Sequence, residues 1–257
     1  MILWLIPVAL ALLGGGATLL LYAASVPSSQ VFGPALVRGP REGNRVALTF
    51  DDGPSPATGE ILDLLAERQI KATFFVCGRN AERHPEIIRR LAAEGHTLGN
   101  HTYSHPFAYL LGRRHLAEEI DRTQDVLERL TGQRPKLFRP PYGARWFGMF
   151  PVLRERGLKV VQWSDTGYDW QMDEAVIARA TLEKLQPGSV ILLHDSLEGT
   201  ESFWVQLRRR LLGRPGDVAP AASPRADRSA TVAALPAILD GAARAGLRFV
   251  SVEEFLT

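Results

Sequence analysis

The stretch RVALTFDDGPSP, residues 45–56, joins an apolar, strand-forming run to two adjacent aspartates and a glycine. Burying a carboxylate is costly unless it is paired or bound to a cation. Asp51 and Asp52 therefore mark either a solvated turn, which the Asp-Gly pair favours, or a functional site. The rest of the chain decides between these alternatives.

Short apolar runs rich in β-branched and aromatic residues recur along the chain, and helical patterns lie between them. This alternation is typical of βα units and a parallel sheet. It fits a closed or nearly closed βα barrel or an open doubly wound sheet. No Gly-rich nucleotide-binding loop follows the first strand, which disfavours a nucleotide site. The expected strands are 45–50, 72–77, 96–100, 136–139, 159–163, 189–193 and 247–251.

Polar clusters follow five of these expected strands at their carboxyl ends. They are DDG at 51–53, HTYSH at 101–105, RPPYG at 139–143, DTGYDW at 165–170 and HD at 194–195. In a βα barrel such ends meet at one mouth, where these barrels perform their chemistry. Five successive clusters are hard to explain as turns alone, so we expect a barrel with a site at this mouth.

The HTYSH cluster places His101 and His105 four residues apart, a spacing that lets two imidazoles face one cation. Such a pair alone is more often incidental than metal-binding. A carboxylate from the DDG cluster would complete a set of His, His and Asp with open positions, which is typical of a catalytic metal site.

In chain order, TFDDGP, HTYSH, RPPYG, DW and LLHD resemble the five motifs of the polysaccharide deacetylase family, which has the NodB homology domain and is known as carbohydrate esterase family 4. The resemblance covers about residues 44–257. It implies an α/β fold, a distorted (β/α)7-type barrel, and metal-dependent removal of N- or O-acetyl groups from polysaccharides. The implied cofactor is one divalent ion, with zinc as first choice and cobalt, manganese or iron as alternatives.

The resemblance also implies roles for residues on the metal side of the mouth. Asp52, His101 and His105 match the metal ligands, and Asp51 matches the general base. Arg139 matches the arginine that pairs with this base, where its charge would keep the carboxylate ionised and oriented.

Further roles are implied for the substrate side. The backbone N–H of Tyr142 matches a donor to the tetrahedral oxyanion. His194 matches the general acid that protonates the departing amine, and Asp169 matches the carboxylate that hydrogen-bonds this histidine and raises its pKa. Trp170 and Leu192 match the walls of a small apolar pocket for the acetyl methyl group.

The fourth motif departs from the commonest family pattern. Many relatives have an aspartate where this chain has Thr166, and an apolar residue where Asp165 stands. Asp165 could be a second carboxylate near the mouth or a turn residue at the strand end. The substrate side is therefore less well defined by sequence than the metal side.

Residues 2–24 carry no charge and are long enough, at about 1.5 Å per residue, to cross a hydrocarbon core of about 30 Å. We expect residues 1–25 to form a transmembrane anchor or a signal peptide, and the Pro-, Gly- and Ser-containing residues 26–43 to form a linker. A single catalytic domain would then span 44–257. The arginines that follow the span leave its orientation open, and we expect a membrane-anchored or secreted protein with an extracytoplasmic domain.

The composition of the 257-residue chain limits its partners. It is 46% hydrophobic and has a formal net charge of +2, so one large core is expected and nothing points to a nucleic acid. Cys77 is the only cysteine, which rules out an intrachain disulfide, and its apolar neighbours predict a buried small hydrophobe.

The sequence favours a hydrolase that deacetylates an N-acetylglucosamine polysaccharide, either peptidoglycan or a chitin-like glycan. Deacetylation of O-acetylated glycans is an alternative. A glycosidase using Asp51 and Asp169 would need no metal, and the histidine pair argues against it. A non-catalytic glycan-binding module at the membrane is a further alternative, although Asp51, Arg139 and His194 are all present.

Overall fold

The computed structural model describes residues 15–16, 18–169, 172–197 and 228–256. Most of the predicted membrane segment lies outside these residues, and residues 18–25 at its end are helical. Among the helices of the described part, none combines the length and apolarity needed to cross a bilayer. The membrane anchor therefore stays a prediction.

The described strands form one nine-stranded sheet in which every pairing is parallel. The strand order is β1-β6-β5-β4-β3-β2-β8-β7, and β9 also pairs with β2. The parallel α/β architecture predicted from the sequence is thus confirmed. The strands are β1 (Ala35–Leu36), β2 (Arg45–Asp51), β3 (Thr73–Val76), β4 (Thr97–Asn100), β5 (Leu137–Phe138), β6 (Lys159–Val161), β7 (Asp165–Thr166), β8 (Val190–His194) and β9 (Arg248–Val250).

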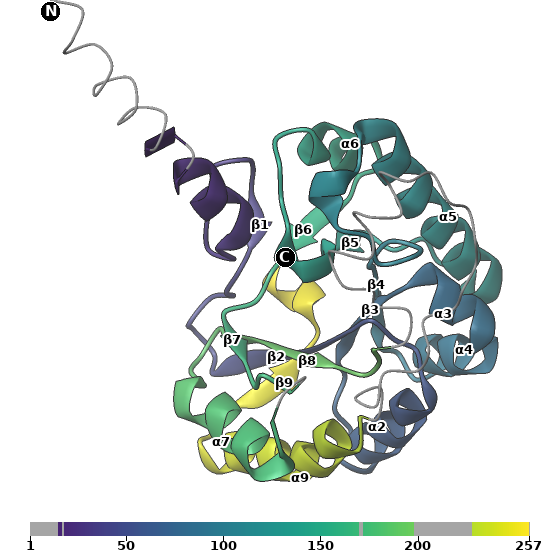
Figure 1. Ribbon diagram of the computed structural model, residues 1–257. Coiled ribbons are helices and arrows are strands. Elements are labelled where there is room, and N and C mark those ends of the chain that lie inside the picture. The colour runs from purple at the N-terminus through teal and green to yellow at the C-terminus, as the bar shows by residue number, and fades with distance from the viewer. Residues whose placement is uncertain (1–14, 17, 170–171, 198–227, 257) are drawn as a thin grey trace, which may run out of the picture.

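Helices surround the outer face of the sheet, as in a barrel (Figure 1). The helices are α2 (Pro56–Glu67), α3 (Gly78–Arg83), α4 (Pro85–Ala93), α5 (Arg113–Thr131), α6 (Met149–Glu155), α7 (Glu174–Lys184) and α9 (Ser229–Arg244), with 3-10 turns η2 (Ala108–Leu110), η3 (Pro141–Gly143) and η4 (Val252–Phe255). Each of the seven predicted strand segments contains a strand, but β1 and β7 were not predicted. The helical pattern of residues 80–95 is divided at His84 into α3 and α4, because Pro85 disfavours a helical conformation in the residue before it.

The alternation of side chains along β2 separates the core from the site. Leu48 and Phe50 belong to the cluster between the sheet and its helices. Ala47 instead belongs to a second apolar cluster, which contains Val252 and Phe255 of η4. Since successive strand residues point to opposite faces, Thr49 and Asp51 share the face of Ala47. This face is therefore apolar at the amino end of β2 and polar at its carboxyl end.

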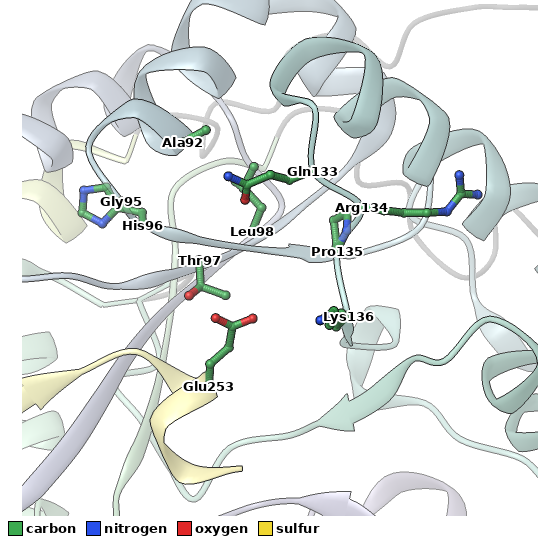
Figure 2. A pocket seen from close by; sticks show the side chains of 10 residues that line it. All are labelled: Ala92, Gly95, His96, Thr97, Leu98, Gln133, Arg134, Pro135, Lys136 and Glu253. Atoms are coloured by element: carbon green, nitrogen blue, oxygen red, sulfur yellow. The ribbon is translucent and has the colours of Figure 1, made fainter. Parts of the chain in front are cut away.

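The amino ends of the strands carry a separate, polar hollow (Figure 2). It lies where β4 and β5 begin, and Glu253 of η4 reaches its edge. None of the predicted site residues lines it. The lining residues are Ala92, Gly95, His96, Thr97, Leu98, Gln133, Arg134, Pro135, Lys136 and Glu253.

One ion pair bridges the two strands at the ends of the sheet order, β1 and β7. Arg38, two residues after β1, donates from Nη2 to Oδ2 of Asp165 in β7 at 3.2 Å and from Nη1 to the Ser189 hydroxyl at 3.0 Å. Asp165 is buried and lies level with Ile191 of β8. It is therefore neither a turn residue nor a carboxylate at the mouth, but the buried half of this bridge.

Residues 26–43, expected to form a linker, are attached to the barrel. β1 pairs with β6, and Gly39 donates its N–H to the Gly188 carbonyl at 2.8 Å. The fully buried Arg145 donates to the carbonyls of Val26 and Ser29. Residues 26–43 therefore make specific contacts with the rest of the domain, which their Pro-, Gly- and Ser-containing composition did not predict.

Candidate active site

The three predicted metal ligands meet at the carboxyl ends of β2 and β4. Asp52 directly follows β2, and His101 and His105 lie on the loop after β4. All three are buried, and Oδ1 of Asp52 lies 3.2 Å from Nε2 of His101 and 3.0 Å from Nε2 of His105. One ligand atom from each lies within 4.8 Å of the other two. Burial raises the pKa of Asp52, but His105 and His101 outweigh it and hold this pKa well below its usual range.

The hydrogen bonds of this cluster fit a bound cation. Nδ1 of His101 lies 2.7 Å from the Arg139 carbonyl oxygen, which can only accept, so Nδ1 carries a proton. In the neutral ring, Nε2 then presents a lone pair toward Asp52, whose buried Oδ1 has no hydrogen-bond donor among the described residues. Ligand atoms each about 2.0–2.2 Å from one ion are separated by distances of this order. The two nitrogens and one carboxylate suit zinc and neighbouring transition metals.

The predicted base, Asp51, lies between this cluster and a buried arginine. Arg139, which is completely buried, donates from Nη1 to Oδ1 of Asp51 at 2.6 Å and to the Thr49 hydroxyl at 2.8 Å. Its other nitrogens donate to the carbonyls of Val161 and Gln162. Burial lowers the pKa of Arg139 although Asp51 opposes the shift. The second Asp51 oxygen, Oδ2, lies 3.9 Å from Nε2 of His101, so the Asp51 carboxylate lies between Arg139 and the cluster of predicted metal ligands.

The predicted acid, His194, stands beside the base because β2 and β8 pair in register. His194 is the Cα partner of Asp51. Its Nδ1 lies 2.8 Å from Oδ1 of Asp169, and Oδ2 of Asp169 accepts from the His194 backbone N–H at 2.7 Å and from the Thr231 hydroxyl at 3.0 Å. Burial lowers the pKa of His194, but Asp169, with smaller effects of Asp52 and Asp51, raises it to about 9.

The remaining predicted residues lie around these groups. Tyr142 has a backbone φ of +59°, and its ring stacks on Phe107 with a centroid separation of 3.7 Å and meets the edge of His105 at 4.6 Å. Leu192 is buried two residues before His194, on the same face of β8. Trp170 lies outside the described residues.

Asp195 is a part of the site to which the sequence assigned no role. Its carboxylate accepts from the Gly53 N–H at 3.0 Å and the Thr58 hydroxyl at 2.6 Å, and its own N–H donates to the Asp51 carbonyl at 3.2 Å. A Cβ on Gly53 would lie 2.0 Å from Oδ2 of Asp195, so only glycine fits. Asp195 therefore fixes the loop that follows Asp51 and Asp52. The HD pair in the fifth motif was the available signal, but the contact spans 142 positions.

Known proteins are similar to this chain in sequence and in fold. The sequence profile of the polysaccharide deacetylase family matches residues 38–162, so Asp169 and His194 lie beyond it. A peptidoglycan-N-acetylglucosamine deacetylase of Bacillus cereus is 44% identical over 163 residues, which are 63% of this chain and 59% of that protein. A chitooligosaccharide deacetylase of Sinorhizobium fredii is 39% identical over 177 residues, 68% of this chain and 78% of the relative.

A solved structure extends the likeness to the fold. The crystal structure of a peptidoglycan N-acetylglucosamine deacetylase superposes with a TM-score of 0.70 at 35% sequence identity, over 85% of this chain and 91% of that one. Together with the sequence matches and the arrangement of the motif residues, this likeness means that the chain belongs to the polysaccharide deacetylase family.

Proposed function

We propose that this protein is a metal-dependent hydrolase that removes acetyl groups from an N-acetylglucosamine-containing polysaccharide, peptidoglycan or a chitin-like glycan. The observation that carries the proposal is the position of Asp51. This carboxylate lies between Arg139 and the ligand His101, and it is the register partner of His194. The names of the relatives, which act on peptidoglycan and chitooligosaccharides, support the substrate class.

The cation bound by Asp52, His101 and His105 would lower the pKa of a water molecule and polarise the acetyl carbonyl. Asp51 takes the proton of the attacking water as general base. Arg139 holds Oδ1 of Asp51, which leaves Oδ2 facing the ligand cluster and oriented toward the nucleophile.

His194 donates a proton to the departing amine, which is a poor leaving group as an anion. Its Nδ1 is held by Asp169, so Nε2 is the nitrogen that transfers the proton. The Tyr142 N–H stabilises the oxyanion of the tetrahedral intermediate. The family resemblance assigns Leu192 and Trp170 to the pocket for the acetyl methyl group.

The two other functions inferred from the sequence fit the geometry less well. In a glycosidase one of the two carboxyl groups must donate a proton, whereas Asp51 and Asp169 each contact a basic side chain, Arg139 and His194. A silent binding module would not require the base, its arginine and the acid to be assembled around one mouth. Turnover separates all three possibilities.

We further propose that residues 2–24 hold the enzyme at a membrane, with its domain on the extracytoplasmic side near a wall or matrix glycan. The uncharged length of this segment supports the proposal. A C-terminal reporter fusion that is active only outside the cytoplasm would test it, and a full-length fusion without reporter activity would refute this location.

The central experiment measures acetate released from chitooligosaccharides and from peptidoglycan by the purified chain, with and without added zinc. Mass spectrometry should show the loss of acetyl groups from intact glycan chains. Shortened chains would instead indicate a glycosidase, and unchanged glycans with retained binding would indicate a silent module.

A further inference from the structure

Three residues on the loops of the ligand cluster have a left-handed backbone conformation. The φ angles are +77° at Asp52, +66° at Thr102 and +56° at His105. Residues other than glycine rarely adopt such angles, and they persist only where surrounding contacts hold them. Two of the three residues are metal ligands, so the contacts that hold these loops bear directly on the site.

The carbonyl groups of the histidine loop are held by the start of α3. Gly78 donates its N–H to the Thr102 carbonyl and Arg79 donates to the Tyr103 carbonyl, each at 3.0 Å. These two bonds fix one side of the peptide chain between His101 and His105. The opposite side, which carries the N–H groups, needs acceptors of its own.

The Thr102 N–H donates to Oδ1 of Asn100 at 2.9 Å, and a single carboxylate accepts from the other two. Glu119 of α5 accepts at Oε2 from the backbone N–H groups of Tyr103 and Ser104, at 2.9 and 2.7 Å, and at Oε1 from the Ser104 hydroxyl at 2.8 Å. Hydrogen bonds to an ionised acceptor are roughly twice as strong as neutral ones. Glu119 lies outside all five sequence motifs.

We propose that Glu119 is a positioning residue that preorganises His101 and His105 for the cation. The inference rests on the metal site of the proposed function. Without Glu119, two adjacent N–H groups between the ligands lose their acceptor, and the loop must turn to find others. His105, at the strained end of the loop, would then leave its position beside Asp52. Changes to the partners that orient metal ligands typically weaken metal affinity by about 10–100-fold.

The test compares Glu119→Ala and Glu119→Gln with Glu118→Ala in the full purified chain. Glu118 is the matched control because it precedes Glu119 on α5 but pairs with Arg114 at the surface. Zinc affinity of the metal-free proteins is measured by competition with a chromogenic chelator, and their unfolding temperature is measured without metal. Deacetylation is then assayed at limiting and at saturating zinc.

We expect Glu119→Ala to raise the zinc dissociation constant by about 10–100-fold, Glu119→Gln to raise it less, and Glu118→Ala to leave it unchanged. Saturating zinc should restore most activity. A Glu119→Ala protein that is less stable but binds zinc as the wild type does would overturn the inference. If the Glu119→Ala protein does not fold, a Glu119→Gln protein that binds zinc with the affinity of the wild type would also overturn the inference. If even the wild type deacetylates no glycan, the proposed function fails. The zinc affinities of the variants would still test the positioning role of Glu119.

Discussion

The mouth of the barrel has two sides that are built differently. The metal side consists of Asp52, His101 and His105 with the predicted base Asp51 and its partner Arg139, which come from the carboxyl ends of β2, β4 and β5. The acid side, with His194 and Asp169, depends on Thr231 of α9, which lies 62 positions from Asp169. The metal side is therefore a set of motifs at the ends of three strands of one sheet, whereas the acid side is completed by a remote helix.

The two sides also differ in how they balance charge. On the acid side, Asp169 pairs with His194 at 2.8 Å and lies 3.9 Å from Nη1 of the buried Arg228, so its charge has two basic partners. On the metal side, Arg139 balances Asp51, and Oδ1 of Asp52 lies within 3.2 Å of the Nε2 atoms of two imidazoles, an arrangement that fits a cation. Loss of metal should thus disturb one side and leave the other intact, which variants on each side can test.

The largest effect is expected from His101→Ala. It removes one of three ligands, so the protein should purify without bound zinc and its deacetylase activity should fall to background. Metal analysis and acetate release measure the two losses. His115→Ala is the control, because His115 is exposed on α5. Full zinc occupancy in His101→Ala would contradict the assigned ligand set.

Asp51→Asn should separate catalysis from metal binding on the same side of the mouth. The amide keeps the shape of the side chain but cannot take a proton, so the rate should fall by about 10²–10⁴ while zinc stays bound. Steady-state kinetics and metal analysis check both parts. Asp63→Asn is the control, since Asp63 is an exposed partner of Arg90. Activity near that of the wild type would exclude Asp51 as the base.

On the acid side, Asp169→Asn should change the pH profile rather than metal content. Asp169 raises the pKa of His194 to about 9, and its removal should return this pKa toward the usual value of about 6.5. An acid must be protonated to act, so the variant should lose activity as pH rises between these values. Below about pH 6.5 the imidazole is protonated in both proteins and the difference should shrink. If the pH profiles of kcat/KM for the wild type and the variant coincide, Asp169 does not control the pKa of the acid His194.

The sequence predicted those site residues that stand in short motifs directly after strands, because the geometry of a parallel sheet brings such motifs together. Parallel strands bring their carboxyl ends to one edge, so DDG, HTYSH, RPPYG and HD could be expected to meet from their strand positions alone. The structure brings together Asp51, Asp52, His101, His105 and Arg139, as well as the pair His194 and Asp169. Their catalytic roles stay predictions until variants are measured.

What could not be predicted depends on long-range contacts or on very short elements. β1 and β7 have two residues each, too few to show a period. Glu119 and Thr231 lie on helices whose sequences are ordinary amphipathic patterns, and their partners lie 16 and 62 positions away. Asp165 resembled a turn because its partner Arg38 precedes the expected domain.

The smallest effect is expected from the ion pair of Asp165 in the edge strand β7, after which the chain continues to Asp169. Arg38 keeps 25% of its side chain exposed, whereas Asp165 keeps 3%, so the two halves of the bridge between β1 and β7 are not equivalent. Arg38→Gln leaves a buried carboxylate without its cation, which should cost roughly 1–3 kcal/mol of unfolding free energy. Asp165→Asn leaves a cation that can reach water, and should cost less.

Urea unfolding of the wild type, both single variants and the double variant gives their free energies of unfolding, and a double-mutant cycle then gives the coupling between Arg38 and Asp165. Because neither residue contacts Asp169 or His194 in any described hydrogen bond, kcat should stay near that of the wild type while stability falls. A fall in kcat together with a shifted pH profile would instead show that β7 positions Asp169. The acid side would then depend on the amino-terminal segment as well as on α9, which would widen its difference from the metal side.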